Sequence, residues 1–568
     1  MQEIEFSVLG GIGENGKNLY LLKIKSSYFI LDMGLKYPNM SMHGIDSIIP
    51  EYTSLENVKN KIKGIFITSA FETHCGSLPY LIKYFKAPVY ASEFVIDILK
   101  ANLENNNDKN KNNVNISQVE FKSIDENSQI DFEDTKTVFF RVAHFLPETL
   151  GMAFETSQGY LVYISEIHFL QSKNKNFQTN FLALSKLNSK KTLALMVASQ
   201  GAFHITEQKK EEALEYSISS YFASIKNNII ISFLIPDLLK IQLIIDIAVE
   251  FNLKIALLGR KNEKIVDIAI QKGYLKIPNG FLVNLKGMKD YLKYKNLVVI
   301  IVGKRFEPLY RLQRMCKETD RLMKLHPQDK ILLLSIEVTG IDKIQNKTID
   351  YLARNGFVVD ILIKDLLTVS YNYEENFKLI LHLLNPKYLL PIIGEHRHQY
   401  QMKKIAQNFN FPANKIFMLE NGDSWNYDLK NNPSINKKTF KNLGEFLIDG
   451  TPVLEGNEYI IKDRELLAND GVLIIACNLN LKLKKIIGNI ELISKGFLDK
   501  TKIVSFLSEI KILFANLIQD FLTNNKQNQW SDFKNYLREE LSKFIFKKTQ
   551  KKPIIIPALI TIDNKTNK

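Results

Sequence analysis

Short apolar runs bounded by polar and glycine-rich turns dominate the first 165 residues. The runs are rich in β-branched and aromatic residues, a pattern typical of strands. They predict strands at residues 3–8, 19–24, 27–32, 63–67, 137–143, 151–156 and 159–165. The polar tract 102–115 has almost nothing to bury, so we expect a surface loop there.

From about residue 206 the pattern changes to apolar strands that alternate with helical periods. The strands are predicted at 228–234, 254–258, 297–302 and 330–335. Such alternation predicts a parallel sheet with helices on its faces. Near the end, apolar positions over 533–544 predict a helix, and an apolar run closes the chain at 553–562.

Length and charge narrow the class of protein. At 568 residues the chain is longer than a single hydrophobic core normally supports, so two or three domains are expected. The net charge of +14 suits a polyanion partner such as RNA, although a coding bias toward Lys, Asn and Ile would produce the same charge. The three cysteines show no metal-binding spacing, which excludes a zinc finger.

No apolar run reaches the roughly 20 residues that a membrane-spanning helix needs. The first residues, Met1 to Glu5, have neither the basic end nor the apolar centre of a signal peptide. We therefore expect a cytoplasmic protein with no membrane partner.

The stretch from Thr68 to Gly76 reads Thr-Ser-Ala-Phe-Glu-Thr-His-Cys-Gly, between a predicted strand and a predicted helix at 77–85. It resembles the loop Thr-His-x-His-x-Asp-His-x-Gly, which binds two metal ions in hydrolases of the metallo-β-lactamase fold. Ser69, Phe71 and Thr73 stand at three of its four ligand positions. The loop keeps the spacing of a metal-binding loop, but most of the side chains that would bind the metal are absent.

Further strings widen the resemblance to the ribonuclease J family, the β-CASP branch of that fold. They follow the family's order along nearly the whole chain, at residues 9–18, 43–50, 141–149, 385–395 and 551–557. The resemblance implies an α/β protein: a metallo-β-lactamase αββα sandwich, an inserted β-CASP parallel-sheet domain and a small α+β C-terminal domain.

The resemblance also implies domain boundaries. The metallo-β-lactamase domain would occupy residues 1–205 and return at 357–430, with the β-CASP domain at 206–356. Little apolar content around Pro433 indicates a linker at 431–445. The C-terminal domain would then span 446–568, a region that serves dimerisation in the family.

Two metal ions about 3.5 to 4 Å apart perform phosphodiester hydrolysis in such centres. By the resemblance, positions 69, 71 and 144 would hold one ion, positions 73, 74 and 393 the other, and position 166 would bridge them. This chain keeps only His74, His144 and Glu166 as metal-ligand candidates, and Glu166 replaces the family's Asp. We therefore expect no catalytic residues and no cofactor, with zinc or manganese bound only if activity persists.

The other histidines have two interpretations each. His168 is either a hydrogen-bonded residue at a strand end, which we favour, or an improvised metal ligand. His396 and His398 open a predicted helix and are expected to be exposed or to cap it.

The resemblance extends to an eroded phosphate-binding loop. Residues 370–374 resemble the family's Ser-Gly-His-Gly-Ser loop, with tyrosines in place of both glycines. We expect RNA-binding residues there and in a basic pair nearby: Ser370, Asn372, Lys304 and Arg305. Tyr371 and Tyr373 would either stack bases or, as we favour, fill the vacated pocket.

The residues that would bind metal or phosphate are mostly replaced, while the turns typical of the fold are kept. This combination favours a protein that keeps the fold but does not catalyse the hydrolysis. The resemblance then implies a ribonuclease J-like pseudoenzyme in RNA processing, mRNA decay and rRNA maturation, which binds RNA or acts as a scaffold. It would form a homo-oligomer, or a hetero-oligomer with an active ribonuclease J paralogue. The alternative is an active metal-dependent 5′-3′ exoribonuclease or endoribonuclease, so the sequence alone does not decide whether the protein is an enzyme.

Overall fold

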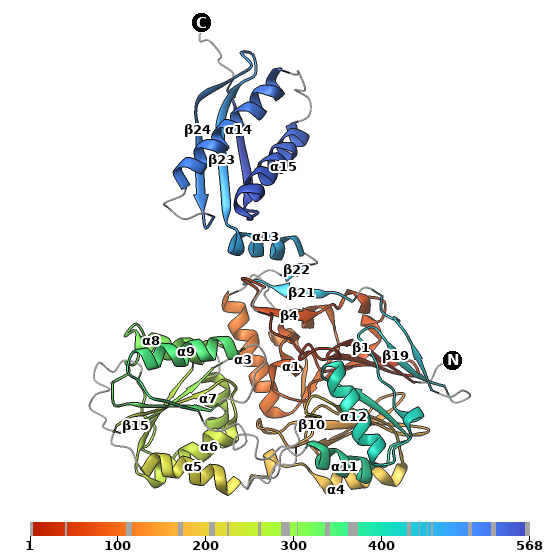
Figure 1. The fold of residues 1–568 in the computed structure, drawn as a ribbon. Coiled ribbons are helices and arrows are strands. Elements are labelled where there is room, and N and C mark those ends of the chain that lie inside the picture. Colours follow the sequence, from red (N-terminus) through yellow and green to blue (C-terminus); the bar gives the residue numbers. More distant parts are fainter. Residues whose placement is uncertain are drawn as a thin grey trace. The chain divides into compact units, whose positions relative to one another are not determined.

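The computed structural model gives two compact units, which Figure 1 colours along the sequence. It describes residues 4–39, 42–109, 116–168, 174–203, 211–223, 227–259, 263–285, 296–303, 305–334, 341–361, 373–428, 433–441, 443–450, 453–455, 458–497, 503–523 and 530–562. The first unit comprises Met1–Tyr37 and Asp46–Val453, and the second comprises Pro38–Ile45 and Leu454–Lys568. Within the described residues, no helix is long and apolar enough to cross a membrane.

Two sheets face each other in the first unit. The first has the order β20-β19-β1-β2-β3-β5-β6-β7 and the second β18-β12-β11-β10-β9-β8. The strands of the first sheet are β1 (Ile4–Gly10), β2 (Leu19–Ile24), β3 (Ser27–Leu31), β5 (Ile62–Phe66), β6 (Val89–Ala91), β7 (Phe121–Ser123), β19 (Ser424–Tyr427) and β20 (Ser434–Asn436). Those of the second are β8 (Gln129–Asp131), β9 (Lys136–Arg141), β10 (Leu150–Thr156), β11 (Gly159–Ile164), β12 (Thr192–Ala198) and β18 (Tyr388–Ile392).

One apolar core lies between these sheets, because the inward side chains of both belong to a single buried cluster. Phe29 of β3, Phe154 of β10 and Trp425 of β19 are among its fully buried members. Helices cover the outer faces: α3 (Glu93–Lys109) packs in the cluster of the first sheet, and α4 (Phe181–Leu187), α11 (Tyr373–Leu384) and α12 (His396–Asn408) in that of the second. The layers are those of the αββα sandwich expected for the metallo-β-lactamase fold.

A parallel five-stranded sheet forms between β12 and β18 in the sequence, with the order β14-β15-β13-β16-β17. Its strands are β13 (Ile229–Phe233), β14 (Lys254–Leu258), β15 (Leu297–Val302), β16 (Lys330–Leu334) and β17 (Val359–Ile361). The helices α5 (Glu211–Ala223), α6 (Leu238–Glu250), α7 (Glu263–Gln271), α8 (Glu307–Cys316) and α9 (Asp342–Arg354) alternate with them. The predicted alternation of apolar strands and helical periods is confirmed.

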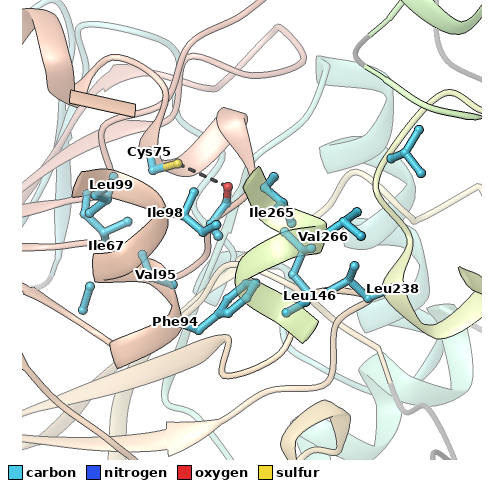
Figure 2. Close-up of a cluster of buried hydrophobic side chains, with 14 of the residues drawn as sticks. Ile67, Cys75, Phe94, Val95, Ile98, Leu99, Leu146, Leu238, Ile265 and Val266 are labelled. Atoms are coloured by element: carbon cyan, nitrogen blue, oxygen red, sulfur yellow. Dashed lines mark hydrogen bonds between the residues drawn. The ribbon is translucent and has the colours of Figure 1, made fainter. Parts of the chain in front are cut away.

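The inserted sheet is joined to the rest of the unit by a continuous apolar contact. Figure 2 shows Phe94 and Ile98 of α3 facing Ile265 and Val266 of α7, with Leu146 between them. Ion pairs flank this contact, since Lys272 Nζ lies 3.0 Å from a Glu93 carboxylate oxygen and 2.9 Å from one of Asp97. Apolar burial and paired charge hold the insert in place.

Two local predictions are wrong. The polar tract at 102–115 is not wholly a loop, because α3 continues to Lys109. Buried apolar residues from Phe94 to Leu103 set the helix, and polar residues extend it. The helix predicted at 77–85 is instead the short α2 (Leu78–Leu81) followed by a 3₁₀ turn at Ile82–Tyr84.

The second unit is a three-stranded sheet with helices on one face. Its order is β24-β23-β25, with β23 (Val472–Asn480), β24 (Lys485–Lys495) and β25 (Ile554–Thr561). The helices α14 (Ile503–Thr523) and α15 (Trp530–Thr549) pack on it, and α13 (Glu458–Asn469) precedes it (Figure 1). Residues 434–436, inside the expected linker, form β20, and β21 (Glu445–Ile448) begins at its last residue. The expected domain boundaries remain predictions.

Candidate functional site

A polar cluster forms where strands of both sandwich sheets end. Asp32 follows β3, and Thr68 follows β5, which runs parallel to β3. His144 follows β9 and Glu166 follows β11, two strands that share the orientation opposite to β10. His74 joins them from α1 (Glu72–Cys75). Parallel strands bring the loops after their carboxyl ends together, and such loops commonly carry ligands.

Asp32 is fully buried and contacts three other residues of this cluster. Its carboxylate accepts hydrogen bonds from the Thr68 amide at 2.8 Å, the Thr68 hydroxyl at 2.9 Å and the Tyr163 hydroxyl at 2.8 Å. His74 Nδ1 lies 2.9 Å from the second carboxylate oxygen. These donors compensate the desolvation of a buried carboxylate.

Asp32 and Tyr163 are site residues that the sequence did not reveal. They lie 131 positions apart, so no local motif joins them. The one available signal was Asp32 itself, an acid at the end of an apolar strand.

Three histidines, His74, His144 and His168, meet on Glu166. His74 Nε2 lies 3.3 Å and His144 Nε2 3.7 Å from the same Glu166 oxygen, while His168 Nε2 lies 3.1 Å from the other. The side chain of Glu166 is 19% exposed, whereas the histidines are buried. An ionised carboxylate only accepts hydrogen bonds, so it orients the imidazole N–H groups toward itself.

The protonation of His74 follows from its two carboxylate neighbours. Burial by itself would lower its pKa, but attraction to Asp32 and hydrogen bonds to Asp32 and Glu166 outweigh it and raise the pKa to about 10. Burial likewise opposes the ionised form of Glu166, yet hydrogen bonds from His168 and His74 hold the Glu166 pKa well below its usual range. His74 is therefore an imidazolium between two carboxylates.

His144 has the opposite charge state. Burial, together with repulsion from the nearby His168 and His74, lowers its pKa to about 3 against the attraction of Glu166. Its Nδ1 accepts a hydrogen bond from the Leu146 amide at 3.2 Å, which places the proton of the neutral ring on Nε2. The ring thus presents an N–H, and not a lone pair, toward Glu166.

Comparisons with known proteins show what this chain is similar to. The ribonuclease J β-CASP domain matches residues 226–352, and the ribonuclease J C-terminal domain matches residues 459–562. Ribonuclease J2 of Bacillus subtilis (strain 168) is 29% identical over 561 residues, which cover 99% of each chain. Ribonuclease J 2 of Staphylococcus saprophyticus is also 29% identical over 561 residues, with the same coverage.

These matches support the ribonuclease J family for this chain. Among solved structures, a protein from Enterococcus faecalis V583 whose title gives its function as unknown covers 75% of this chain and 100% of its own, at 13% identity. Its TM-score of 0.49 is too low to support an argument about this chain.

The ribonuclease J family is metal-dependent, and the residues of this chain do not fit a two-metal centre. Ser69 Oγ accepts hydrogen bonds from the Phe71 amide at 3.3 Å and from Thr149 at 3.4 Å. The Phe71 ring packs edge-on against His144, with centroids 6.1 Å apart. Apolar bulk and a neutral hydroxyl thus occupy two positions where the first metal would need imidazoles.

The position of the second metal is changed in the same way. Ile393 is 3% exposed and has a φ of +50°, which a β-branched residue rarely adopts. Its amide donates to the Tyr20 hydroxyl at 3.2 Å, and its carbonyl oxygen accepts from the Ser199 hydroxyl at 3.0 Å. These contacts hold the unusual backbone while an aliphatic side chain stands at the ligand position.

Across the described ranges, no group of three or more His, Cys, Asp or Glu side chains is arranged to hold a metal ion. Of the family's ligand positions, only those of His74, His144 and Glu166 keep a side chain that commonly binds metal, which is fewer than two ions need. The raised pKa of His74 favours its protonated form beside Glu166.

The predicted RNA-binding residues are only partly visible. Lys304, Ser370, Tyr371 and Asn372 lie outside the described residues. The Arg305 guanidinium lies 4.3 Å from the Phe306 ring centroid and 5.3 Å from that of Tyr37, whose hydroxyl donates to Glu72. Arg305 is thus part of an aromatic group that reaches the loop carrying His74.

Tyr373 does not stack bases, because it is 2% exposed and its hydroxyl donates to the Ala198 carbonyl oxygen at 2.7 Å. It fills space in the apolar cluster between the second sheet and the helices α4, α11 and α12, which is the interpretation we favoured. His398 caps α12 by accepting the Glu395 amide at 3.0 Å, and His396 is exposed. Both expectations for these two histidines are confirmed.

Proposed function

We propose that this chain is a ribonuclease J-like protein of RNA processing and mRNA decay that has no nuclease activity of its own. It acts as an RNA-binding or scaffold subunit beside an active homologue, in the cytoplasm. The β-CASP and C-terminal matches and the full-length similarity to ribonucleases J2 support the RNA-processing part.

The replaced ligand positions carry the proposal of inactivity. In a two-metal hydrolase, the cations generate the attacking hydroxide and stabilise the charge at phosphorus. Here Ser69, Phe71, Thr73 and Ile393 stand at four of the positions that would hold the ions, and His74 Nε2 lies 3.3 Å from a Glu166 carboxylate oxygen. Too few donor side chains remain to hold the two ions that would generate the hydroxide.

Metal analysis tests this part. The purified chain is equilibrated with zinc or manganese, desalted and analysed for bound metal, and its cleavage of 5′-monophosphorylated RNA is measured. We expect far less than one ion per chain and no cleavage above the blank. Close to two ions per chain together with metal-dependent cleavage would refute inactivity.

A variant with restored ligands serves as the matched control. Ser69→His, Phe71→His and Thr73→Asp return the donor types that the family loop carries, and Ile393→His adds an imidazole at the remaining altered position. Tighter zinc binding by this variant than by the wild type would show that the backbone still suits the site and that ligand identity limits it.

RNA binding is proposed to use the basic pair Lys304 and Arg305, with Ser370 and Asn372 from the eroded phosphate loop. The net charge of +14 favours a polyanion, and Arg305 is held between the rings of Tyr37 and Phe306. The double variant Lys304→Ala with Arg305→Ala should weaken binding of single-stranded RNA about equally for all sequences, since such contacts are made to phosphates. Lys404→Ala on α12 is the control and should bind as the wild type does.

The second candidate is an active metal-dependent 5′-3′ exoribonuclease or endoribonuclease. The convergence of three imidazoles on Glu166 favours it, because His168 could join His74 and His144 around one zinc or manganese ion. The same metal and cleavage assays decide, as activity that His168→Ala abolishes would establish this candidate.

A further inference from the structure

Four exposed lysines lie at the amino ends of two neighbouring strands in the first sheet of the sandwich. Lys61 and Lys63 are at the start of β5, and Lys83 and Lys86 come shortly before β6. All four side chains are exposed. We call these four residues the basic edge.

Strand pairing brings the two pairs of lysines together. The strands β5 and β6 run parallel with Ile65 beside Val89, and the Ile65 amide donates to the Pro88 carbonyl oxygen at 3.0 Å. Lys63 is two residues before Ile65, and Lys86 is three residues before Val89. Because paired strands are about 4.8 Å apart, both segments enter the sheet at the same edge, and their charges add there.

Acidic side chains do not neutralise the basic edge. Residues 57–63 and 81–88 contain five lysines and no Asp or Glu. Of the nearby acids, Glu56 pairs with Lys59, and Glu120, which precedes β7, pairs with Lys122 at 3.1 Å. Within the ranges that the structure describes, no lysine of the basic edge forms an ion pair. This surface therefore offers its positive charge to a partner.

An aromatic ring lies among these charges. Tyr84 is 36% exposed, and Lys83 Nζ lies 5.3 Å from the centroid of its ring. The Tyr84 ring packs against that of the buried Tyr52, with centroids 4.3 Å apart, which holds it in place. Surfaces that bind single-stranded nucleic acid combine basic side chains for the phosphates with such rings, on which bases stack.

The basic edge is separate from the polar cluster around Glu166. That cluster includes Thr68, which follows the carboxyl end of β5. Lys63 precedes Thr68 by five residues, which at about 3.3 Å per residue places them roughly 16 Å apart along the strand. A ligand on the basic edge therefore does not occupy the candidate site.

We propose that the basic edge binds the phosphate backbone of single-stranded RNA, as a second contact surface at the far end of β5 from the candidate site. The lysines contact phosphates of any sequence, and Tyr84 stacks a base. An acidic segment of a partner protein would use the same charges, but the exposed ring favours RNA. The inference rests on the proposed RNA-binding role, to which it adds a surface.

Salt-dependent binding tests the basic edge on the full chain. Fluorescence anisotropy with a labelled single-stranded oligouridine measures the dissociation constant between roughly 50 and 200 mM salt. Changing all four lysines of the basic edge to alanine should raise that constant at least about tenfold. The slope of log affinity against log salt should become shallower by about 2 to 3, because each phosphate contact on a single strand contributes about 0.7.

Two control variants separate a local site from general charge and from misfolding. The first removes the same number of exposed lysines from α4, the turn after α7, α9 and α12, and should change the salt slope by less than about 1. Its substitutions are Lys186→Ala, Lys276→Ala, Lys347→Ala and Lys404→Ala. The second changes the four lysines of the basic edge to arginine, which keeps the charge and should keep the wild-type affinity. Circular dichroism verifies that each variant is folded.

Adding Lys304→Ala and Arg305→Ala to the alanine variant of the basic edge should multiply the two losses of affinity, because separate sites act independently. A wild type that binds RNA equally well without the basic edge would overturn this inference and leave the proposed RNA-binding role intact. So would an alanine variant that loses only its binding to an active homologue, or an equal loss in the scattered control. A wild type that binds no RNA would overturn both.

Discussion

At the scale of single residues, the site shows how a metal centre can be replaced by hydrogen bonds. Glu166 stands where a bridging carboxylate would face cations, and here it accepts from His74 and His168. Asp32 holds the other side of His74 at 2.9 Å. The imidazolium and its carboxylates satisfy one another, which stabilises the buried polar cluster without an ion.

Glu166→Gln tests this charge pairing. The amide cannot neutralise His74, so the pKa of His74 should fall and the free energy of unfolding should drop by about 1 to 3 kcal/mol. Urea unfolding measures the stability and NMR titration the pKa. Glu250→Gln, on the exposed end of α6, is the control and should change stability by less than about 0.5 kcal/mol.

Stability should depend on pH in two directions. His74 has a pKa raised to about 10, so its contribution is complete below pH 6.5 and is lost as the pH rises toward 10. His144 has a pKa lowered to about 3 in the folded chain. Between pH 6.5 and 3 this histidine therefore binds a proton in the unfolded chain but not in the folded chain, so the free energy of unfolding falls as the pH is lowered through this range. The depressed pKa of Glu166 adds to the acid loss, because its contribution is present above its unfolded value and disappears as the pH falls.

The urea midpoint measured across pH checks this profile. His74→Gln should flatten the alkaline part relative to the wild type and leave the acid loss due to His144. An unchanged alkaline slope would mean that His74 is not protonated in the folded chain.

At the scale of elements, the contact of α3 with α7 matters most, because it joins the inserted sheet to the sandwich (Figure 2). The Glu148 carboxylate adds a polar link by accepting the Phe94 amide at 2.9 Å, and Tyr274, which follows α7, donates to the same carboxylate. The loop carrying His144 and Glu148 is thus attached to both parts.

Ile98→Ala should loosen this contact. Ile98 is 2% exposed, and truncating such a residue leaves a cavity that costs about 2 to 5 kcal/mol. Chemical unfolding monitored by circular dichroism measures the loss. Lys100→Ala, two residues further along α3 at an exposed position, should have little effect, and an equal loss for both variants would contradict the role of the contact.

At the scale of the whole molecule, the two units have separate cores. The cluster around Phe514 and Leu537 contains residues of the second unit only. Leu537→Ala should therefore lower one calorimetric transition and leave another at its wild-type temperature. A single transition that shifts as a whole would show that the units unfold together.

The net charge of +14 leads to a further expectation at this scale. If the basic residues contact RNA, affinity should fall at least about tenfold between roughly 50 and 200 mM salt, because bound cations are released from the RNA. Fluorescence anisotropy with a single-stranded RNA measures this. A flat salt dependence would instead favour a coding bias as the origin of the charge.

The sequence by itself determined where most strands lie along the chain, the alternation of strands and helices in the inserted domain, and the loss of metal ligands. Those features depend on local periodicity and residue type, which are visible along the chain. Even so, α3 ran past its predicted end, because a helix set by buried residues such as Phe94 carries polar residues beyond them.

Only the tertiary structure decided how the surviving residues are used. Asp32 and Tyr163 meet across 131 positions, and the proton of His144 is placed by the Leu146 amide. Ile474, Ile493 and Ile556 lie side by side because β23 pairs with both β24 and β25. These properties depend on burial and on contacts between residues far apart in the sequence, which no short stretch of the chain reveals.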